Sequence, residues 1–476
     1  MGVSTGPRVA VVGAGVSGLA AAYRLVQQRP TLDVLVLEGA DRVGGALLLG
    51  DVAGVQVDLG AESVLARRPE AVDLVCAVGL GADVVHPQTT QAAIWTRGRL
   101  RPMPSGVMGV PADVAATAAS GILSPRGALR LRASVLSRSR PRPLDAPDVS
   151  VGDFVAHSVG TEVLDRMVEP LLGGVYAGHA RELSLRAASP QVAELAQTGG
   201  SLVAAAAAKR AATGGTQPPV LAGLVGGVGR LPQQLADRLP AVRTAAGVRR
   251  LTPRVGGGYD LDVGSAAQPE RVSVDAVLLA TPAGPTARLL SAFTPSAAAD
   301  LRRVEYASMA VVSLAVPRAS FPTAPSGSGF LVPPVDGRAI KAATWSSSKW
   351  GWVSGAAGPE TVLVRTSLGR HREEAVLQRD DAEMVALAMA DLHDAVGLRG
   401  PLTDAVVTRW GGALPQYAVG HAEMVARVRA AVAGLEALEV CGAAYDGLGV
   451  AACVAGAQQA ADRLLADLAT RGTMAP

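Results

Sequence analysis

The sequence predicts an α/β protein, α+β overall, and three observations lead to this fold class. An apolar strand at residues 9–12 runs into a glycine-rich turn and a helix, as in the first unit of a Rossmann-like domain. After residue 295, β-branched stretches that alternate with polar residues predict antiparallel strands. A second glycine-rich loop and a long helix close the chain. We therefore predict a discontinuous Rossmann-like domain, interrupted by a helical subdomain and a β-sheet domain.

The first forty-five residues build a site for a dinucleotide. Gly13, Gly15 and Gly18 form a G-x-G-x-x-G motif between the first strand and its helix. Gly13 permits the tight turn, Gly15 lets backbone N–H groups approach a pyrophosphate, and Gly18 lets the helix pack closely on the strand. The next apolar strand, residues 34–37, ends at Glu38, whose carboxylate is placed to accept ribose hydroxyls. Because this carboxylate would repel the 2′-phosphate of NADP, FAD and NAD remain as ligands.

Length and composition bound the class of protein. With 476 residues the chain is too long for one core and predicts two or three domains. A net charge of +3 implies no nucleic-acid partner. Cys76, Cys441 and Cys453 lack metal-ligand spacing, so we expect three buried small hydrophobes in a reducing cytoplasm and no metal site. Residues 105–123 are poor in charge but contain Pro111 and Asp113, so no transmembrane span is predicted.

The middle of the chain predicts a hairpin followed by helices. Residues 92–101 form the hairpin, and residues 112–136 are helical. Arginine and proline dominate residues 137–147, which indicates an exposed linker. An amphipathic helix then covers residues 163–172, and we expect Gly173-Gly174 to end it.

The second half returns to the nucleotide domain twice. A strand is predicted from residue 242 through Val248 to residue 251, and a buried strand at residues 275–280 completes the nucleotide sheet. Residues 409–421 predict a glycine-rich crossover, which leads to a strand at 438–441 and a final helix that begins near Val450. These elements give the following predicted domains: the nucleotide-binding domain in three parts (1–80, 221–295 and 409–476), a mostly helical substrate or membrane-like subdomain (81–220) and a β-rich substrate domain (296–408).

Several motifs carry a family resemblance. Glu38, Arg42, Gly44 and Gly45, followed by DLGAE at residues 58–62, resemble the flavoproteins with two dinucleotide-binding domains, which include amine oxidases, phytoene desaturases and protoporphyrinogen-type oxidases. Four further motifs are similar to the protoporphyrinogen/coproporphyrinogen oxidase family, and to its Gram-positive bacterial members in particular. They are PLLGGVYAG (170–178), GSGFLVP (327–333), TWSSSKW (344–350) and PQYAVGH (415–421).

The resemblance implies FAD as the cofactor and assigns residues to it. The helix that begins near Val450 would point its positive end at the flavin, where it stabilises the anion of the reduced ring. The residues implied to bind FAD are Gly13, Ala14, Gly15, Val16, Ser17, Gly18, Glu38, Gly39, Arg42, Gly60, Ala61, Glu62, Ser63, Val248, Trp410, Leu448, Gly449 and Val450.

Substrate contacts are also implied. Gly174, Val175 and Tyr176 are expected to line the substrate cavity, and Tyr417 to face the ring system. Lys349 is the preferred partner for a substrate propionate, with Lys341, Arg365 and Arg370 as further candidates. His421 is expected to be a structural hydrogen-bonding group. No side chain is assigned a catalytic role, because the flavin N5 would accept the hydride and the protein mainly orients the donor carbon.

The implied activity is the FAD-dependent, six-electron oxidation of coproporphyrinogen III to coproporphyrin III in haem biosynthesis, with dioxygen reduced to hydrogen peroxide. The expected location is the cytoplasm, and the arginine-rich linker could contact a downstream chelatase. Three alternatives stay open: a protoporphyrinogen IX oxidase, a flavin amine oxidase or carotenoid desaturase, and a non-enzymatic flavin-binding module.

Overall fold

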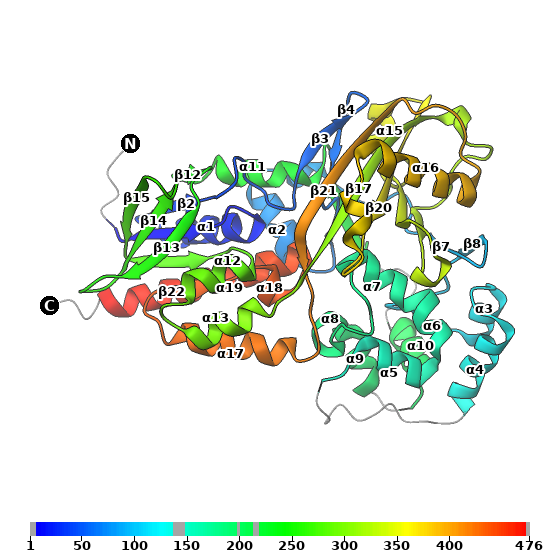
Figure 1. Ribbon diagram of the computed structural model, residues 1–476, viewed down its shortest axis with the longest axis horizontal. Coiled ribbons are helices and arrows are strands. Elements are labelled where there is room, and N and C mark those ends of the chain that lie inside the picture. Colours follow the sequence, from blue (N-terminus) through cyan, green and yellow to red (C-terminus); the bar gives the residue numbers. More distant parts are fainter. Residues whose placement is uncertain (1–5, 137–147, 198–199, 213–218, 473–476) are drawn as a thin grey trace.

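The computed structural model describes residues 6–136, 148–197, 200–212 and 219–472. The predicted linker at residues 137–147 lies outside these residues. Figure 1 shows the parallel sheet and its helices at one end of the molecule, and the large mixed sheet above the helical region at the other end.

A parallel five-stranded sheet is the centre of the nucleotide domain. Its central strands have no solvent exposure at most positions, because helices cover both faces. Residues from the start, the middle and the end of the chain contribute strands, which agrees with the predicted discontinuous domain. In spatial order, the strands are β12 (Ala241–Arg243), β2 (Asp33–Leu37), β1 (Arg8–Val12), β16 (Ala276–Leu279) and β22 (Leu438–Val440).

Each face of this sheet has its own apolar core. One core lies under helices α1 (Val16–Gln28), α2 (Pro69–Ala77), α11 (Leu231–Ala236) and α19 (Val450–Gly472). The other core lies under α12 (Ala283–Leu290), α13 (Pro295–Arg302) and α17 (His421–Ala433), together with an antiparallel sheet of β13 (Val248–Pro253), β14 (Tyr259–Gly264) and β15 (Pro269–Val274).

The prediction of one strand over residues 242–251 is wrong. β12 ends at Arg243 and pairs in parallel with β2, whereas β13 begins at Val248 and pairs antiparallel with β14. Ala245 between them has a positive φ of 51° and donates its N–H to Ala40 O at 2.6 Å, so the chain turns away from the parallel sheet there.

A seven-stranded mixed sheet forms the second region of the molecule. One face packs on α16 (Asp381–Val396) and buries Ala310, Val312, Val364 and Leu368. The predicted hairpin joins this sheet through the parallel pairing of β7 with β18. In spatial order, the strands are β21 (Asp404–Pro415), β17 (Tyr306–Pro317), β20 (Thr361–Leu368), β19 (Ile340–Trp345), β18 (Gly329–Leu331), β7 (Ala92–Thr96) and β8 (Arg99–Pro102).

The predicted crossover at residues 409–421 is also wrong in its first part. Residues up to Pro415 belong to β21, which pairs with β17 from Asp404 to Pro415. The register shifts between Ala307 and Met309, and Gly412 opposite them has a φ of 54°. The glycines thus serve a bulge inside a long strand. The predicted boundary between residues 408 and 409 lies within this strand.

Helices fill the third region, as predicted. They are α3 (Val114–Ala119), α4 (Pro125–Leu136), α5 (Val151–Val159), α6 (Thr161–Val163), a π-helical turn (Leu164–Val168), α7 (Glu169–Tyr176), α8 (Leu185–Ala188), α9 (Pro190–Gln197) and α10 (Leu202–Ala212). We expected Gly173-Gly174 to end their helix, but both glycines lie inside α7. The helix stops at Ala177, which has a φ of 47°. Two glycines cost about 2 kcal/mol of helix propensity, and the burial of Leu172 and Tyr176 in the helical core offsets this.

Short elements connect these regions. They are β3 (Leu49–Val52), β4 (Val55–Asp58), β5 (Val64–Leu65), β6 (Val84–Val85), β9 (Gly106–Val107), β10 (Val110–Pro111), β11 (Leu221–Leu224), α14 (Ser346–Lys349), α15 (Gly351–Ala357) and α18 (Ala443–Asp446). Cys441 and Cys453 are buried, as predicted, but Cys76 is exposed, because α2 turns Ala71, Leu74 and Val75 toward the core instead. Throughout the described ranges, the helices are too short or too polar to cross a bilayer.

Candidate functional site

The glycines of the turn after β1 have two different roles. A Cβ on Gly18 would lie 1.8 Å from Gly13 O, and a Cβ on Gly13 would lie 2.9 Å from Ala280 O, so the fold itself requires both glycines. A Cβ on Gly15 would meet no protein atom within 4 Å. The fold itself therefore does not require a glycine at position 15, and the open space there is available to a ligand.

Polar groups converge at the same turn. Gly15 caps α1, and no side chain caps the N–H groups of the first helical turn, which includes Val16, Ser17 and Gly18. The Glu38 carboxylate lies beside them and accepts the N–H of Ala14 at 2.6 Å and of Ala40 at 2.8 Å. Free N–H groups at a helix start bind phosphate oxygens, so the turn fits a pyrophosphate next to a ribose.

A second loop is held against this turn. Gly44 donates its N–H to Ala14 O at 2.8 Å, and Gly44 also forms an isolated parallel bridge with Gly15. Arg42 donates to the carbonyl oxygens of Val43 at 3.1 Å and Gly45 at 2.8 Å, which braces the loop. The Arg42 guanidinium is therefore held by the loop that lies against the glycine turn.

Residues 59–63 connect this loop to the large sheet. Trp410 of β21 donates its Nε1–H to Leu59 O at 3.2 Å. A Cβ on Gly60 would lie 2.0 Å from Ala46 O and 3.0 Å from the Trp410 ring, so this position has no room for a side chain. The Arg42 guanidinium carbon lies 5.9 Å from the Trp410 ring centre. Gly60, Ala61, Glu62 and Ser63 are thus placed between the nucleotide domain and the seven-stranded sheet.

The end of the chain reaches the same place. Val450 at the start of α19, Val16 at the start of α1 and Ala61 all pack on one apolar cluster around Leu47 and Val228. Gly449 is exposed, and a Cβ there would meet no atom within 4 Å. Leu448 packs on the core of the helical region. Two helix starts from opposite ends of the sequence therefore border one region.

Val248 lies at the Glu38 side of this region. Ala246 donates its N–H to Glu38 O at 2.7 Å, and a Cβ on Gly247 would lie 3.6 Å from the Cα of Gly39. The glycine turn, the loops at residues 42–45 and 59–63, and the start of α19 are therefore close together, and their assignment to FAD stays a prediction. Their geometry fits a dinucleotide along the carboxyl ends of the parallel strands.

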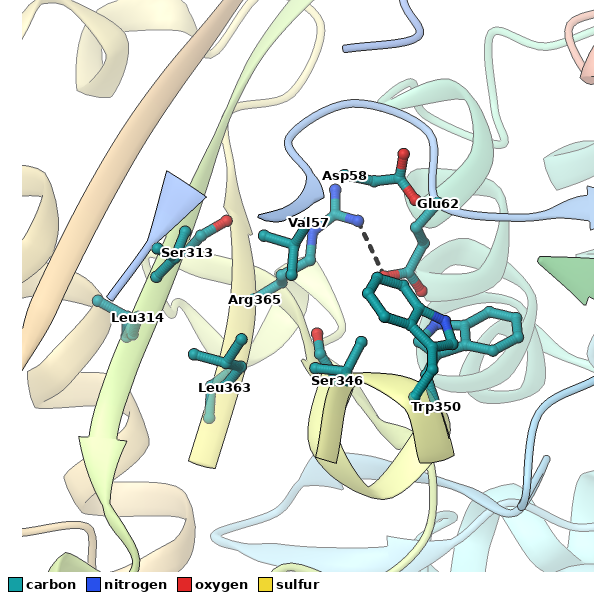
Figure 2. Close-up of a pocket in the computed structure, with 13 residues that line it drawn as sticks. Val57, Asp58, Glu62, Ser313, Leu314, Ser346, Trp350, Leu363 and Arg365 are labelled. Atoms are coloured by element: carbon teal, nitrogen blue, oxygen red, sulfur yellow. Dashed lines mark hydrogen bonds and ion pairs between the residues drawn. The ribbon is translucent and has the colours of Figure 1, made fainter. Parts of the chain in front are cut away.

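Glu62 is the centre of a buried ion cluster, shown in part in Figure 2. Lys349 Nζ pairs with Glu62 Oε1, Arg365 Nη1 lies 2.9 Å from Oε2, and Arg365 Nη2 donates to Gly60 O at 2.6 Å. Burial alone would raise the pKa of Glu62, but the charges of Lys349 and Arg365 lower it to about 2. The Glu62 carboxylate is therefore occupied by Lys349 and Arg365, which leaves the backbone of residues 59–63 to contact a cofactor.

Asp58 lies beside this cluster and has the opposite shift. Burial raises the pKa of Asp58 to about 6, although its carboxylate accepts N–H groups from Gly229 at 2.8 Å and Val228 at 3.0 Å. A cavity of about 20 Å³ adjoins Asp58 and Glu62, and the unpartnered hydroxyls of Ser313 and Ser346 line it. This volume accommodates one molecule of the size of water.

The five residues predicted to bind substrate fall into three groups. Gly174 and Val175 are exposed on α7, and Val175 keeps 45 % of its surface. Tyr176 and Tyr417 are buried, and their hydroxyls donate to the backbone oxygens of Ala188 and Ala443. Lys349 is paired with Glu62, as described above.

His421 has the structural place that the sequence predicted. It stacks on Tyr417 with ring centres 4.2 Å apart, and Nε2 lies 3.0 Å from Ala444 O. Burial lowers the pKa of His421 to about 4, so the ring is neutral and Nε2 donates to that carbonyl. Within the described ranges, no cluster of three His, Cys, Asp or Glu side chains could hold a metal ion.

The sequence analysis did not predict which groups contact the charged side chains of the large sheet. Arg365 interrupts the apolar strand TVLVRTSL, and Lys341 interrupts IKAATW. A charge inside a buried strand needs a partner, so each was a signal in the sequence. The partners themselves are distant in sequence and could not be found from it.

Three comparisons place these features among known proteins. A family model described as flavin containing amine oxidoreductase matches residues 16–465. The chain is 36 % identical over 468 residues to the coproporphyrinogen III oxidase of Mycobacterium leprae, which covers 96 % of this chain and 98 % of the relative. Identity to the coproporphyrinogen III oxidase of Staphylococcus aureus is 29 %, over 97 % of this chain and 99 % of the relative.

A solved structure has the same architecture. It is a crystal structure of a candidate protoporphyrinogen oxidase from Exiguobacterium, with a TM-score of 0.85 and 29 % identity. The match covers 97 % of this chain and 99 % of the other.

Proposed function

Because this chain belongs to the flavin-containing amine oxidoreductase family, we propose that it is an FAD-dependent oxidase that converts coproporphyrinogen III to coproporphyrin III. The coproporphyrinogen III oxidases of Mycobacterium leprae and Staphylococcus aureus support the substrate, since each aligns with nearly the whole chain.

One structural observation carries the proposal. The glycine turn, the loop at residues 42–45, the loop at residues 59–63 and the start of α19 border one region, although they span the whole sequence. FAD is long enough to contact all of them, and Gly15 and Gly449 leave space for it. The free N–H groups of α1 would hold the pyrophosphate and Glu38 the ribose, with the loops beside Trp410 and the start of α19 left for the flavin ring.

Bound FAD supplies an acceptor for the hydride that leaves a carbon of the substrate. The chain's own task is to orient that carbon and to keep the site closed to competing reactions. Gly174 and Val175 on α7 are exposed opposite the large sheet, where a Cβ on Gly174 would lie 3.6 Å from Leu331. These residues would contact the flat faces of a macrocycle.

The overall reaction balances with dioxygen, which we propose as the electron acceptor. Conversion of the porphyrinogen to the porphyrin removes six electrons and six protons in three cycles, and three dioxygen molecules become three hydrogen peroxide molecules. The cytoplasmic location and the contact with a chelatase stay predictions of the sequence.

Purified protein tests the proposal directly. We expect a yellow protein with the absorbance of an oxidised flavin, growth of porphyrin fluorescence on addition of coproporphyrinogen III, and formation of hydrogen peroxide. Faster oxidation of protoporphyrinogen IX would select the second candidate, which the Exiguobacterium structure favours. Flavin-bound protein that oxidises neither porphyrinogen would exclude both.

A Gly15→Val variant tests the placement of the cofactor. The valine side chain would occupy the space in front of the helix start, so we expect the purified variant to lose most of its flavin, measured by absorbance after denaturation. Gly355→Val is the matched control, because a Cβ on this exposed glycine of α15 also meets no atom within 4 Å. Flavin retained at one equivalent in the Gly15→Val variant would contradict the placement.

A further inference from the structure

Lys341 is buried in the large sheet without a carboxylate partner. Ile340 pairs with Leu368 and Ala342 pairs with Ser367, so Lys341 is the extra residue of a bulge in β19. It is 2 % exposed. Across the described residues, the polar contact of its Nζ is the thioether Sδ of Met309, at 3.6 Å. A thioether does not neutralise an ammonium, so the burial of this lysine destabilises the fold.

Arg370 places a second cation next to it. Arg370 is 6 % exposed and donates Nη2 to Val332 O at 3.2 Å. Its nearest carboxylate, on Glu373, is 3.9 Å from Nη1 and half exposed, and it also lies 3.4 Å from His179 Nε2. Burial, together with the charge of Arg370, lowers the pKa of Lys341 to about 7. The carboxylates of Glu373 and Glu169 both act on Arg370, whereas among the described residues no carboxylate acts on Lys341 in this way.

The acidic groups on the elements around β19 are already engaged. On α7, Glu169 accepts the N–H of Ala180 at 2.8 Å and contacts His179. On α16, Asp391 accepts the N–H of Ile340 at 2.9 Å and lies 3.7 Å from Arg338. Beyond the strand, Glu62 holds both Arg365 of β20 and Lys349 of α14. Arg370 is the charged group that shifts the Lys341 pKa.

The side chain of Lys341 contacts Met309, which lies on the face of the sheet that points toward the proposed cofactor region. Because Ala310 and Val312 face the core under α16, their neighbour Met309 faces the other way, and it pairs in register with Trp410. Met309, Ala342 and Ser367 keep intermediate exposure although strands flank them on both sides. This face is therefore open to solvent at the position where Met309 covers the lysine.

We propose that Lys341 and Arg370 bind a carboxylate of the substrate, and that Met309 is a displaceable cover over the Lys341 ammonium. The proposal rests on the proposed function, because a porphyrinogen carries propionate groups. Methionine is flexible, so its thioether can give way to a carboxylate oxygen, which is the stronger partner for both cations.

Steady-state kinetics of the flavin-loaded enzyme test this assignment. For Lys341→Met with coproporphyrinogen III at pH 6.5, we expect KM to rise about tenfold or more, with kcat within about twofold and unchanged flavin content. Lys341→Arg should recover part of the affinity. Lys209→Met is the matched control, since Lys209 lies on α10 in an ion pair with Glu194.

The pH dependence separates a binding role from a structural one. In the wild type, KM should rise as the pH passes above about 7, because a neutral Lys341 amine no longer attracts the carboxylate. This rise should vanish in Lys341→Met. A direct measurement of coproporphyrin III binding by quenching of its fluorescence should give the same order of affinities without turnover.

Two outcomes would overturn the assignment: a KM of Lys341→Met equal to that of the active wild type, or the same pH profile in both proteins. If Lys341→Met does not fold, Arg370→Met takes its place with the same expected direction. Failure of the proposed function would look different, because the flavin-bound wild type would then oxidise no porphyrinogen.

Discussion

Two groups of cations are buried in and beside the large sheet, and they differ in what neutralises them. Lys349 and Arg365 share the carboxylate of Glu62, which brings the loop at residues 59–63 onto the sheet. Lys341 contacts a thioether instead, and Arg370 contacts a backbone carbonyl and lies 3.9 Å from the half-exposed carboxylate of Glu373. The first group is complete without a ligand, and the second is not.

This difference separates a structural use of buried charge from a ligand-binding use. Removing one partner of a complete group leaves charges unpaired and destabilises the fold. Removing a cation from an incomplete group relieves the fold and weakens the binding of an anion. The two groups therefore predict opposite signs for changes in the free energy of unfolding.

The largest effect is expected for Glu62→Gln. The variant leaves Lys349 and Arg365 buried without a counter-charge, so we expect the free energy of unfolding to fall by about 3–5 kcal/mol, measured by urea denaturation at pH 7. A Glu62→Gln/Lys349→Met double variant should recover part of the loss, because one unpaired cation is gone. Glu194→Gln, at the exposed pair with Lys209, is the control and should change little.

Acid titration checks the same cluster. Since the pKa of Glu62 is about 2 in the folded protein and 4.5 in the unfolded chain, its contribution is present above pH 4.5 and is lost as the pH falls toward 2. That contribution amounts to about 3 kcal/mol. Asp58 has the opposite effect on the free energy of unfolding. Because its folded pKa is raised, its contribution to stability falls as the pH rises from 3.8 to 6. Identical acid profiles for the wild type and Glu62→Gln would contradict the role of the cluster.

The nucleotide half of the molecule could be predicted closely from the sequence. The first turn, the strand that ends at Glu38 and the helix at Val450 all depend on local patterns, since glycine spacing and apolar runs determine them. The errors in that half concern breaks, such as the turn at Ala245, where a non-glycine residue adopts a positive φ that no sequence pattern marks.

The substrate half was harder to predict because its contacts are distant in sequence. Lys349 was preferred over Lys341 as a propionate partner from motif resemblance alone, and 287 positions separate Lys349 from Glu62. The strand β21 was missed because Gly411 and Gly412 suggest a loop, whereas pairing with β17 accommodates them in a bulge. Tertiary pairing decided both cases.

Lys341→Met should stabilise the protein in the absence of substrate, opposite to Glu62→Gln. We expect a gain of about 1–4 kcal/mol in the free energy of unfolding at pH 6, where both states of the wild type carry the proton. The pKa of Lys341 is about 7 in the folded protein and 10.5 in the unfolded chain. The wild type therefore gains stability as the pH rises from 7 to 10.5, and the advantage of the variant shrinks over that range. A less stable variant at pH 6 would mean that Lys341 has a partner in the free protein.

The smallest effect is expected where both charges are exposed. Arg24 of α1 and Asp462 of α19 form a pair at 2.8 Å, with side chains 37 % and 47 % exposed. This pair joins the two helices whose starts border the proposed cofactor region, so it tests whether position alone makes an ion pair important. Because water screens both groups, Arg24→Gln should change the free energy of unfolding by about 0.5 kcal/mol or less and leave flavin content unchanged. A loss comparable to that of Glu62→Gln would show that contact between α1 and α19, rather than burial of charge, decides which ion pairs hold this fold together.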